Sequence, residues 1–331
     1  MTSDGAAGPG DVPLLSVRSL SIDFGESRVV DDVSFHVSRG EVVALVGESG
    51  AGKTVTALSL LDLVPEPGRR VTGEVVFEGR DVATLPPSEL RRLRGGGIGF
   101  VFQEPGEALD PVRTVGSELV AVLRRHRGLS RDEARREALS WLSRVALPEP
   151  DSRMEDFPHR MSGGMRQRAM VALALAGGPR LLVADEPTTA LDVTIQAQLL
   201  EQIRALRDEL GLAVLLVTHD LDVVAEVADR ALVMYAGEIV EEGPVSRLLA
   251  SPAHPYTRAL LAARPPDGSG AERRSLPATE GPAAVPGAWP PGCRFAPRCP
   301  VAYGLCGREK PRLTPLAGGR AACHLTGRGG T

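Results

Sequence analysis

The chain has 331 residues, of which 43% are hydrophobic and 24% are charged, and its formal net charge is −4. These values are ordinary for a globular protein and give no broad electrostatic reason to bind nucleic acid. The longest purely apolar run, Ala169–Ala176, is far shorter than the roughly 20 residues that a membrane helix needs. Because no basic and apolar leader opens the sequence, we expect the chain to stay in the cytosol and to reach a membrane only through partners.

Strands and helices are predicted to alternate along the chain. In chain order we expect strands over residues 14–24 and 29–46, a helix over 54–63, a mainly helical stretch over 105–161, a strand over 181–185, a helix over 194–210, a strand over 212–218 and a hairpin over 233–240. The nearly all-apolar Glu41–Val46 is typical of a strand buried in a sheet. Ser130 and Glu133 have the spacing of a capping box at a helix start. The pattern predicts an α/β fold with a mostly parallel sheet, interrupted by a helical insertion.

A glycine-rich sequence, GESGAGKT at residues 47–54, follows the predicted buried strand and precedes a predicted helix. The glycines at which its backbone can turn toward a nucleotide are Gly47, Gly50 and Gly52. Tight turning points successive N–H groups and the helix start at an anion. Lys53 is placed to reach the β- and γ-phosphates, and Thr54 to offer its hydroxyl to Mg²⁺. The sequence therefore predicts a phosphate-binding loop that uses ATP and Mg²⁺.

A second motif, LLVADEP at residues 181–187, ends a predicted apolar strand on two carboxylates. Asp185 lies at the carboxyl end of this strand, the edge at which α/β sheets hold ligands, and can hold Mg²⁺ there through water. Glu186 follows and is placed to polarise the water that attacks the nucleotide. On its own the pattern also fits a strand that ends in an exposed acidic turn. The phosphate-binding loop favours the catalytic interpretation.

A third motif, MSGGMRQR at residues 161–168, opens a predicted helix. Ser162, with the backbone of Gly163 and Gly164, would present a hydroxyl and N–H groups to an anion. With the two motifs above, the sequence resembles the ATP-binding-cassette ATPases over about residues 14–260. In that family the third motif completes the nucleotide site of a facing subunit.

The resemblance implies further roles, residue by residue. Gln103, in VFQEP, matches the glutamine that touches Mg²⁺ and the attacking water and senses the membrane subunits. His219 matches the switch histidine on the γ-phosphate, and Phe24 matches the aromatic residue that stacks on adenine. The sequence ALD at residues 190–192, which ends in Asp192, matches the loop that joins the two facing sites.

Several segments resemble the branch of this family that imports dipeptides, oligopeptides and nickel. They are LVGESGAGKTVTALSLL at 45–61, FQEP…LDPVRTVG at 102–116, HPYTRALL at 254–261 and GCRFAPRCP at 292–300. Met165 stands where the usual signature motif has Gln, and this form of the motif is typical of the branch. We expect no loss of function from it, because the phosphate contacts should come from Ser162 and the backbone of Gly163 and Gly164.

The resemblance to this branch implies a set of partners. They are two membrane permease subunits, an extracytoplasmic substrate-binding protein and a second ATP-binding-cassette subunit that is a distinct homologue. The chain would act as a peripheral protein at the cytoplasmic face of the cell membrane. A dipeptide or oligopeptide is the expected substrate, with nickel or another small solute as the alternative.

All four cysteines lie beyond residue 292. They are Cys293, Cys299, Cys306 and Cys323. Their spacing lacks the paired C-x₂-C of many zinc sites, and a cytosolic chain disfavours disulfides. Members of the resembled branch are associated with an iron–sulfur cluster, and thiolates on a Pro/Gly-rich loop suit one. We predict a [4Fe–4S] cluster here, with zinc and unliganded thiols as alternatives, and expect His324 to be a bystander.

The predicted organisation is a P-loop NTPase cassette core over residues 14–260, with an antiparallel β subdomain and a helical subdomain over about 105–178. We expect residues 1–13 to be a disordered tail, 261–292 a Pro/Gly-rich linker and 293–331 a cysteine-rich tail.

Two other classes of protein are weighed against a transporter ATPase. A cassette ATPase of DNA repair or translation usually carries two cassettes or long insertions, whereas this sequence has one phosphate loop and a compact insertion. A regulator that binds nucleotide without hydrolysing it would not need Glu186 or His219.

Overall fold

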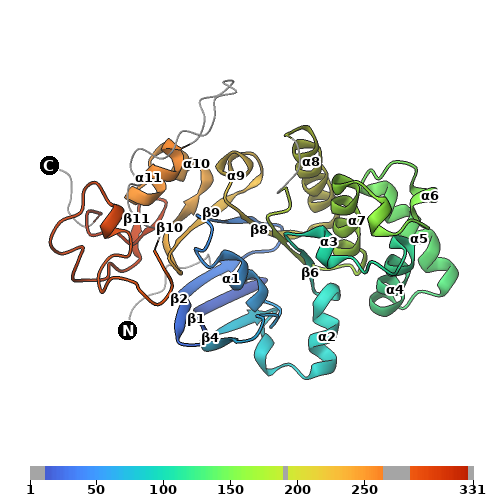
Figure 1. Ribbon diagram of the computed structural model, residues 1–331, viewed down its shortest axis with the longest axis horizontal. Coiled ribbons are helices and arrows are strands. Elements are labelled where there is room, and N and C mark those ends of the chain that lie inside the picture. The colour runs from blue at the N-terminus through green and yellow to red at the C-terminus, as the bar shows by residue number, and fades with distance from the viewer. Residues whose placement is uncertain (1–11, 189–192, 264–283, 327–331) are drawn as a thin grey trace. The chain divides into compact units, whose positions relative to one another are not determined.

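The computed structural model describes residues 12–188, 193–263 and 284–326. Strands and helices alternate in it (Figure 1), and the chain divides into two compact units. The described residues of Met1–Ser38, Val42–Ala83 and Val217–Thr331 form the first unit, and those of Arg39–Glu41 and Thr84–Leu216 form the second.

An antiparallel sheet of the first unit contains four strands in the order β2-β1-β4-β5. Its strands are β1 (Leu15–Phe24), β2 (Ser27–Val37), β4 (Gly68–Phe77) and β5 (Arg80–Asp81). The expectation of one strand over residues 29–46 is wrong, because β2 ends at Val37 and a separate strand begins at Val42. Between them Gly40 adopts a left-handed backbone with φ 69°, which ends the extended conformation.

A second set of strands in the first unit runs in the order β11-β12-β10-β9-β3. These strands are β3 (Val42–Val46), β9 (Arg230–Tyr235), β10 (Glu238–Pro244), β11 (Thr314–Leu316) and β12 (Gly319–Ala321). The expected hairpin is confirmed, since β9 and β10 pair antiparallel around the turn at Ala236 and Gly237. The C-terminal tail adds β12 antiparallel to β10, so it continues this sheet.

Helices of the first unit pack beside these strands. They are α1 (Lys53–Ser59), α9 (Leu221–Val227), α10 (Val245–Ala250) and α11 (Pro255–Ala262), with the 3₁₀ helices η1 (Val82–Thr84) at its boundary and η3 (Ala296–Arg298) in the tail. The helix expected to reach residue 63 ends at Ser59. One hydrophobic core joins Val46, Val233 and Leu248 to Tyr256 of α11 and Phe295 of the tail.

The second unit contains a small set of strands and most of the helices. Its strands, in the order β8-β7-β6, are β6 (Ile98–Val101), β7 (Leu181–Asp185) and most of β8 (Ala213–Thr218). Its helices are α2 (Pro87–Gly96), α3 (Pro105–Ala108), α4 (Val115–Arg127), α5 (Arg131–Arg144), α6 (Pro150–Arg153), η2 (Pro158–Arg160), α7 (Gly163–Ala176) and α8 (Val193–Leu210). The expected capping box is confirmed, since Ser130 and Glu133 bond each other's backbone at the start of α5.

Across the described part of the chain, no helix combines the length and the apolar character that crossing a bilayer would require.

Candidate functional site

The phosphate-binding loop of the first unit connects β3 to α1, as the sequence predicts. Every residue of β3 is buried, and Gly52 stands directly before the helix with a left-handed φ of 99°. A Cβ atom at Gly52 would lie 3.0 Å from the carbonyl oxygen of Val29, and one at Gly47 would collide with the main-chain oxygen of Met234. Glycine is therefore required at both positions by backbone geometry and close packing.

Lys53 points back along this loop. Its side chain is buried, and Nζ donates to the carbonyl oxygens of Gly47 at 2.8 Å and Glu48 at 3.0 Å. Thr54, the next residue, is exposed. An ammonium group inside a loop that opens a helix, next to an exposed hydroxyl, is the donor set that a nucleotide phosphate with Mg²⁺ requires. The residues present fit ATP and Mg²⁺.

Two residues predicted to act on the attacking water meet in the second unit. Strands β6 and β7 are parallel neighbours, with Val101 beside Ala184. Gln103 and Glu186 follow the carboxyl ends of these strands, and Gln103 Nε2 donates to Glu186 Oε2 at 3.4 Å. Glu186 has a left-handed φ of 45°, a conformation that is uncommon for a non-glycine residue and concentrates at functional sites.

The other predicted acid of this motif, Asp185, is the last residue of β7 and is only 2% exposed. A carboxylate at this depth must be held by specific partners or by a cation.

Ser162 begins helix α7 in the second unit. Its hydroxyl oxygen accepts from the N–H of Met165 at 3.3 Å, so it is the N-cap of the helix. Ser162 and Gly163 are exposed, while Gly164 lies close to Ile195 of α8. An exposed helix start with a hydroxyl retains the N–H groups that an anion can bind.

The other residues predicted to contact nucleotide come from three separate parts of the chain. His219 is exposed in the turn between β8 and α9, and Asp220 beside it caps α9 by accepting from the N–H of Asp222 at 2.8 Å. Phe24 ends β1, where its ring lies against Gly68. Asp192 and the rest of the sequence ALD at 190–192 lie outside the described residues.

The C-terminal tail reaches the phosphate-binding loop, which the sequence did not predict. Arg298 donates to both carboxylate oxygens of Glu48, at 2.8 Å and 3.0 Å. The N–H of Glu48 donates to the hydroxyl of Tyr256 at 2.8 Å. Both Tyr256 and Arg298 belong to segments singled out by their resemblance to the peptide-importer branch. No spacing in the sequence connects them to a residue more than 200 positions earlier.

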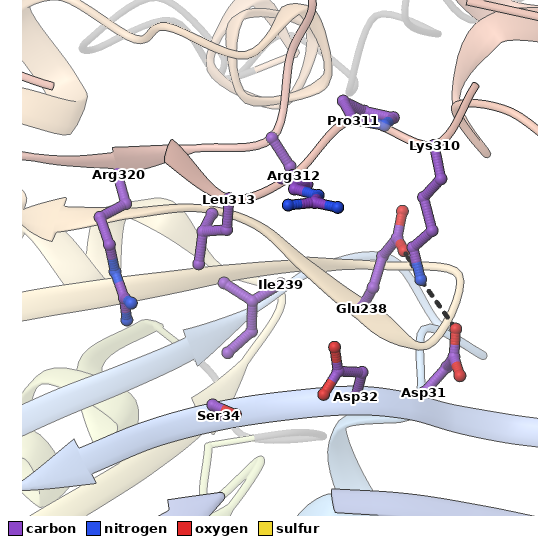
Figure 2. Close-up of a pocket in the computed structure, with 11 residues that line it drawn as sticks. Asp31, Asp32, Ser34, Glu238, Ile239, Lys310, Pro311, Arg312, Leu313 and Arg320 are labelled. Carbon is purple, nitrogen blue, oxygen red and sulfur yellow. Dashed lines mark hydrogen bonds and ion pairs between the residues drawn. The ribbon is translucent and has the colours of Figure 1, made fainter. Parts of the chain in front are cut away.

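A cavity of about 510 Å³ separates part of the tail from β2 and β10 (Figure 2). Lys310 spans its edge, with Nζ 2.8 Å from carboxylate oxygens of both Asp31 and Glu238. Burial lowers the pKa of Lys310, but the two carboxylates outweigh that effect and the net pKa is raised. Its lining comes from β2, β10 and the tail, without a contribution from the phosphate-binding loop among the described residues.

The four cysteines converge on one small cavity of the tail, together with His254 and His324. All four are free thiols. Burial raises the pKa of Cys293 to about 11 and also raises the pKa values of Cys299 and Cys323. Within the described ranges, no group of three or more His, Cys, Asp or Glu side chains is arranged to hold a metal ion. The structure thus gathers the predicted thiols without giving support to the predicted metal.

A glycine-rich phosphate loop between a buried strand and a helix, in a chain of alternating strands and helices, defines a P-loop ATPase. The sequence matches the ABC transporter family over residues 30–189 and the oligopeptide/dipeptide transporter C-terminal region over residues 240–306. It is 44% identical, over 94% of its own length and 96% of the relative, to the dipeptide transport ATP-binding protein DppD of Escherichia coli. The oligopeptide transport ATP-binding protein AppD of Bacillus subtilis is 45% identical over the same shares.

Solved structures agree with these relatives. The fold is similar to the dimeric post-hydrolysis state of the ATP-binding cassette MJ0796 with ADP and Pi, with a TM-score of 0.62, 29% identity, and coverage of 70% of this chain and 98% of that one. The chain belongs to the ATP-binding-cassette family of ABC transporters and is an ABC-type ATPase that uses ATP with Mg²⁺.

Proposed function

We propose that the chain is the ATP-hydrolysing subunit of a dipeptide or oligopeptide importer. The observation that carries the proposal is the combination, in one chain, of the cassette match over residues 30–189 with the oligopeptide/dipeptide transporter C-terminal match over residues 240–306. Relatives that are 44–45% identical over nearly the whole chain are named for dipeptide and oligopeptide transport. Relatives in Brucella abortus that are 50% identical bear the provisional name of peptide import ATP-binding proteins.

Specific residues have assigned roles in this proposal. Lys53 binds the β- and γ-phosphates, and Thr54, Asp185 and Gln103 hold Mg²⁺, which when bound neutralises phosphate charge. Glu186 accepts a hydrogen bond from the attacking water and orients it. The contact between Gln103 and Glu186 supports their joint action on that water. His219 contacts the γ-phosphate, and Phe24 stacks on adenine.

The proposed site is completed by a facing cassette. Ser162, Gly163 and Gly164 present the start of α7 to the nucleotide of the partner cassette, and Asp192 belongs to the loop that joins the two sites. The exposure of Ser162 and Gly163 supports this role. We assign the facing cassette to a distinct homologue, and the pair to the cytoplasmic face of the cell membrane, where it moves two permease subunits fed by an extracytoplasmic binding protein.

Reconstitution tests the proposal. The chain, co-purified with its second ATPase, two permeases and binding protein, is placed in lipid vesicles, and phosphate release is measured with and without a dipeptide or tetrapeptide. We expect peptide to stimulate hydrolysis and labelled peptide to accumulate. Stimulation by nickel alone would reassign the substrate, and ATP hydrolysis indifferent to any solute would contradict the transport function.

The tail cysteines carry a separate part of the proposal, namely a [4Fe–4S] cluster held by Cys293, Cys299, Cys306 and Cys323. Four free thiols around one cavity support it, and the lack of a pre-arranged metal-ion group among the described residues counts against it. Anaerobic purification decides: a brown protein with iron and sulfide supports the cluster. Stoichiometric zinc, or a colourless protein with no metal, refutes it.

A further inference from the structure

Glu48, the second residue of the phosphate-binding loop, is held at three points. Its N–H donates to the hydroxyl of Tyr256 at 2.8 Å, and its carbonyl oxygen accepts from Lys53 Nζ at 3.0 Å. Its carboxylate accepts two hydrogen bonds from Arg298, one to each oxygen. Two of these three points come from outside the loop, and Arg298 comes from the C-terminal tail.

The bond between Arg298 and Glu48 has the geometry of a strong ion pair. A bidentate arginine–carboxylate contact fixes direction as well as distance. The Arg298 side chain is 6% exposed, and one of its nitrogens also donates to the Tyr235 hydroxyl at 3.3 Å. The hydrogen bonds that Arg298 donates to the Glu48 carboxylate raise the pKa of Arg298, so the guanidinium stays charged. Removing one partner of such a pair leaves the other charge uncompensated.

The tail is itself fixed firmly enough to act as a support. Phe295, three residues before Arg298, is 1% exposed and packs against the rings of Tyr235 and Tyr256, with centroid distances of 5.3 Å and 5.4 Å. Arg294 pairs with Asp31 of β2 and lies over the ring of Trp289. Lys310 reaches the same Asp31 (Figure 2). Arg298 therefore projects from an anchored segment and not from a free end.

We propose that Arg298 is a positioning residue for nucleotide binding, through which the C-terminal tail sets the shape and the charge of the phosphate-binding loop. The inference rests on the proposed role of residues 47–54 as the nucleotide loop. Arg298 does not contact nucleotide in this proposal. It holds Glu48, whose carbonyl oxygen accepts a hydrogen bond from Lys53, the lysine proposed to bind phosphate.

Two physical effects follow from this arrangement. The first is steric: with Tyr256 on its N–H and Arg298 on its carboxylate, Glu48 keeps one orientation, and the loop is organised before nucleotide arrives. The second is electrostatic: Arg298 neutralises the only carboxylate in the loop sequence GESGAGKT. Without Arg298 that carboxylate would oppose the entry of a polyphosphate anion.

Equilibrium binding to the full-length chain tests the inference, with MgADP and a non-hydrolysable ATP analogue as probes. We expect Arg298→Ala to weaken both affinities at least about tenfold, which is the scale of a lost hydrogen bond to a charged group. Adding Glu48→Gln to Arg298→Ala should recover part of the affinity, because it removes the uncompensated charge. A purely structural role for Arg298 predicts no such recovery. The loss should also shrink at high salt, since ions screen the exposed part of the charge.

Arg320→Ala is the matched control, because Arg320 joins the tail to Glu242 on β10 at 2.7 Å and does not reach the loop. It should leave nucleotide affinity within about twofold of the parent, a change too small to reflect a lost charged hydrogen bond. If Arg298→Ala does not fold, Arg298→Lys removes the bidentate pair but keeps a positive charge beside Glu48, and it should weaken binding by a smaller factor.

The inference is overturned if folded Arg298 variants bind nucleotide as tightly as the parent, or if Arg320→Ala weakens binding as much. Lys53→Ala separates this outcome from failure of the site itself. Loss of affinity in Lys53→Ala with no loss in the Arg298 variants rejects the inference alone. Full affinity in Lys53→Ala rejects the assignment of the loop.

Discussion

Lowering the pH should destabilise the first unit through one buried histidine. His254 is the N-cap of α11, where its Nδ1 accepts from the N–H of Tyr256 at 3.0 Å. The main-chain N–H of His254 donates to the Glu241 carboxylate, and the imidazole ring packs against Phe295. His254 is 1% exposed. Burial, with a smaller contribution from the positive charge of Arg258, lowers the pKa of His254 to about 3.

The direction of the effect follows from the two pKa values. The unfolded chain binds this proton near the ordinary pKa of about 6.5, whereas the folded chain binds it only near pH 3. The stability contributed by a neutral His254 is therefore fully present above about pH 6.5 and is lost as the pH falls below that value. Each pH unit well below 6.5 costs about 1.4 kcal/mol, so a change from pH 7 to pH 4.5 should cost about 2–3 kcal/mol.

Urea unfolding at pH 7 and at pH 4.5 measures this cost, and His254→Asn isolates it. Asparagine is a favourable N-cap residue and can accept the same N–H bond, but it does not titrate. Carboxylates also titrate in this window, so the informative quantity is the difference between the two proteins. We expect His254→Asn to lose about 2–3 kcal/mol less than the parent between these pH values. An equal loss in both proteins would refute the assignment of a buried neutral histidine.

Three further results are expected. Glu186→Gln in the assembled transporter should keep ATP binding, lose most turnover and accumulate a closed dimer, whereas Lys53→Ala should weaken ATP binding itself. Near-normal phosphate release by Glu186→Gln would reject the role of Glu186 with the attacking water. The chain purified without a second ATPase should hydrolyse ATP only weakly, and robust cooperative hydrolysis by it alone would argue against a distinct partner. Cys299→Ser, prepared anaerobically beside the parent, should lose iron, sulfide and the broad absorption near 400 nm expected of a cluster, and should still bind ATP.

The phosphate-binding loop could be located from the sequence because all its determinants are local. A run of buried residues ending in Gly47, a glycine at Gly52 and a lysine at the helix start occupy fewer than fifteen consecutive positions. Each has a direct physical reason, namely burial, backbone freedom or charge. The capping box at Ser130 could be predicted for the same reason. The ends of elements were harder to predict: α1 ends at Ser59, and its apolar pattern contains no signal for an end there.

Contacts between distant segments could not be predicted in this way. That Gln103 would touch Glu186 depends on β6 and β7 being neighbours, and strand order is not written in the pattern of either strand. The pair of Glu48 and Arg298 is a stronger case, since 250 positions separate them. A glutamate in a loop and an arginine in a proline-rich tail are each ordinary surface residues when considered alone. Only the packing of the tail makes them partners.

That packing also changes how the C-terminal tail should be regarded. A segment of this length, rich in proline and glycine, builds no core of its own, and the sequence therefore favoured metal as the means of holding its shape. The structure supplies another means: Phe295 enters the core of the first unit and packs against the rings of Tyr235 and Tyr256, a burial that stabilises by about 2 kcal/mol. Strand β12 then extends the sheet from β10. Tyr256 of this aromatic cluster accepts from the main-chain N–H of Glu48, and Arg298, beside the cluster, donates to the Glu48 carboxylate. The tail and the loop therefore share one support. A ligand of the cysteines would add to that support and is not required to create it.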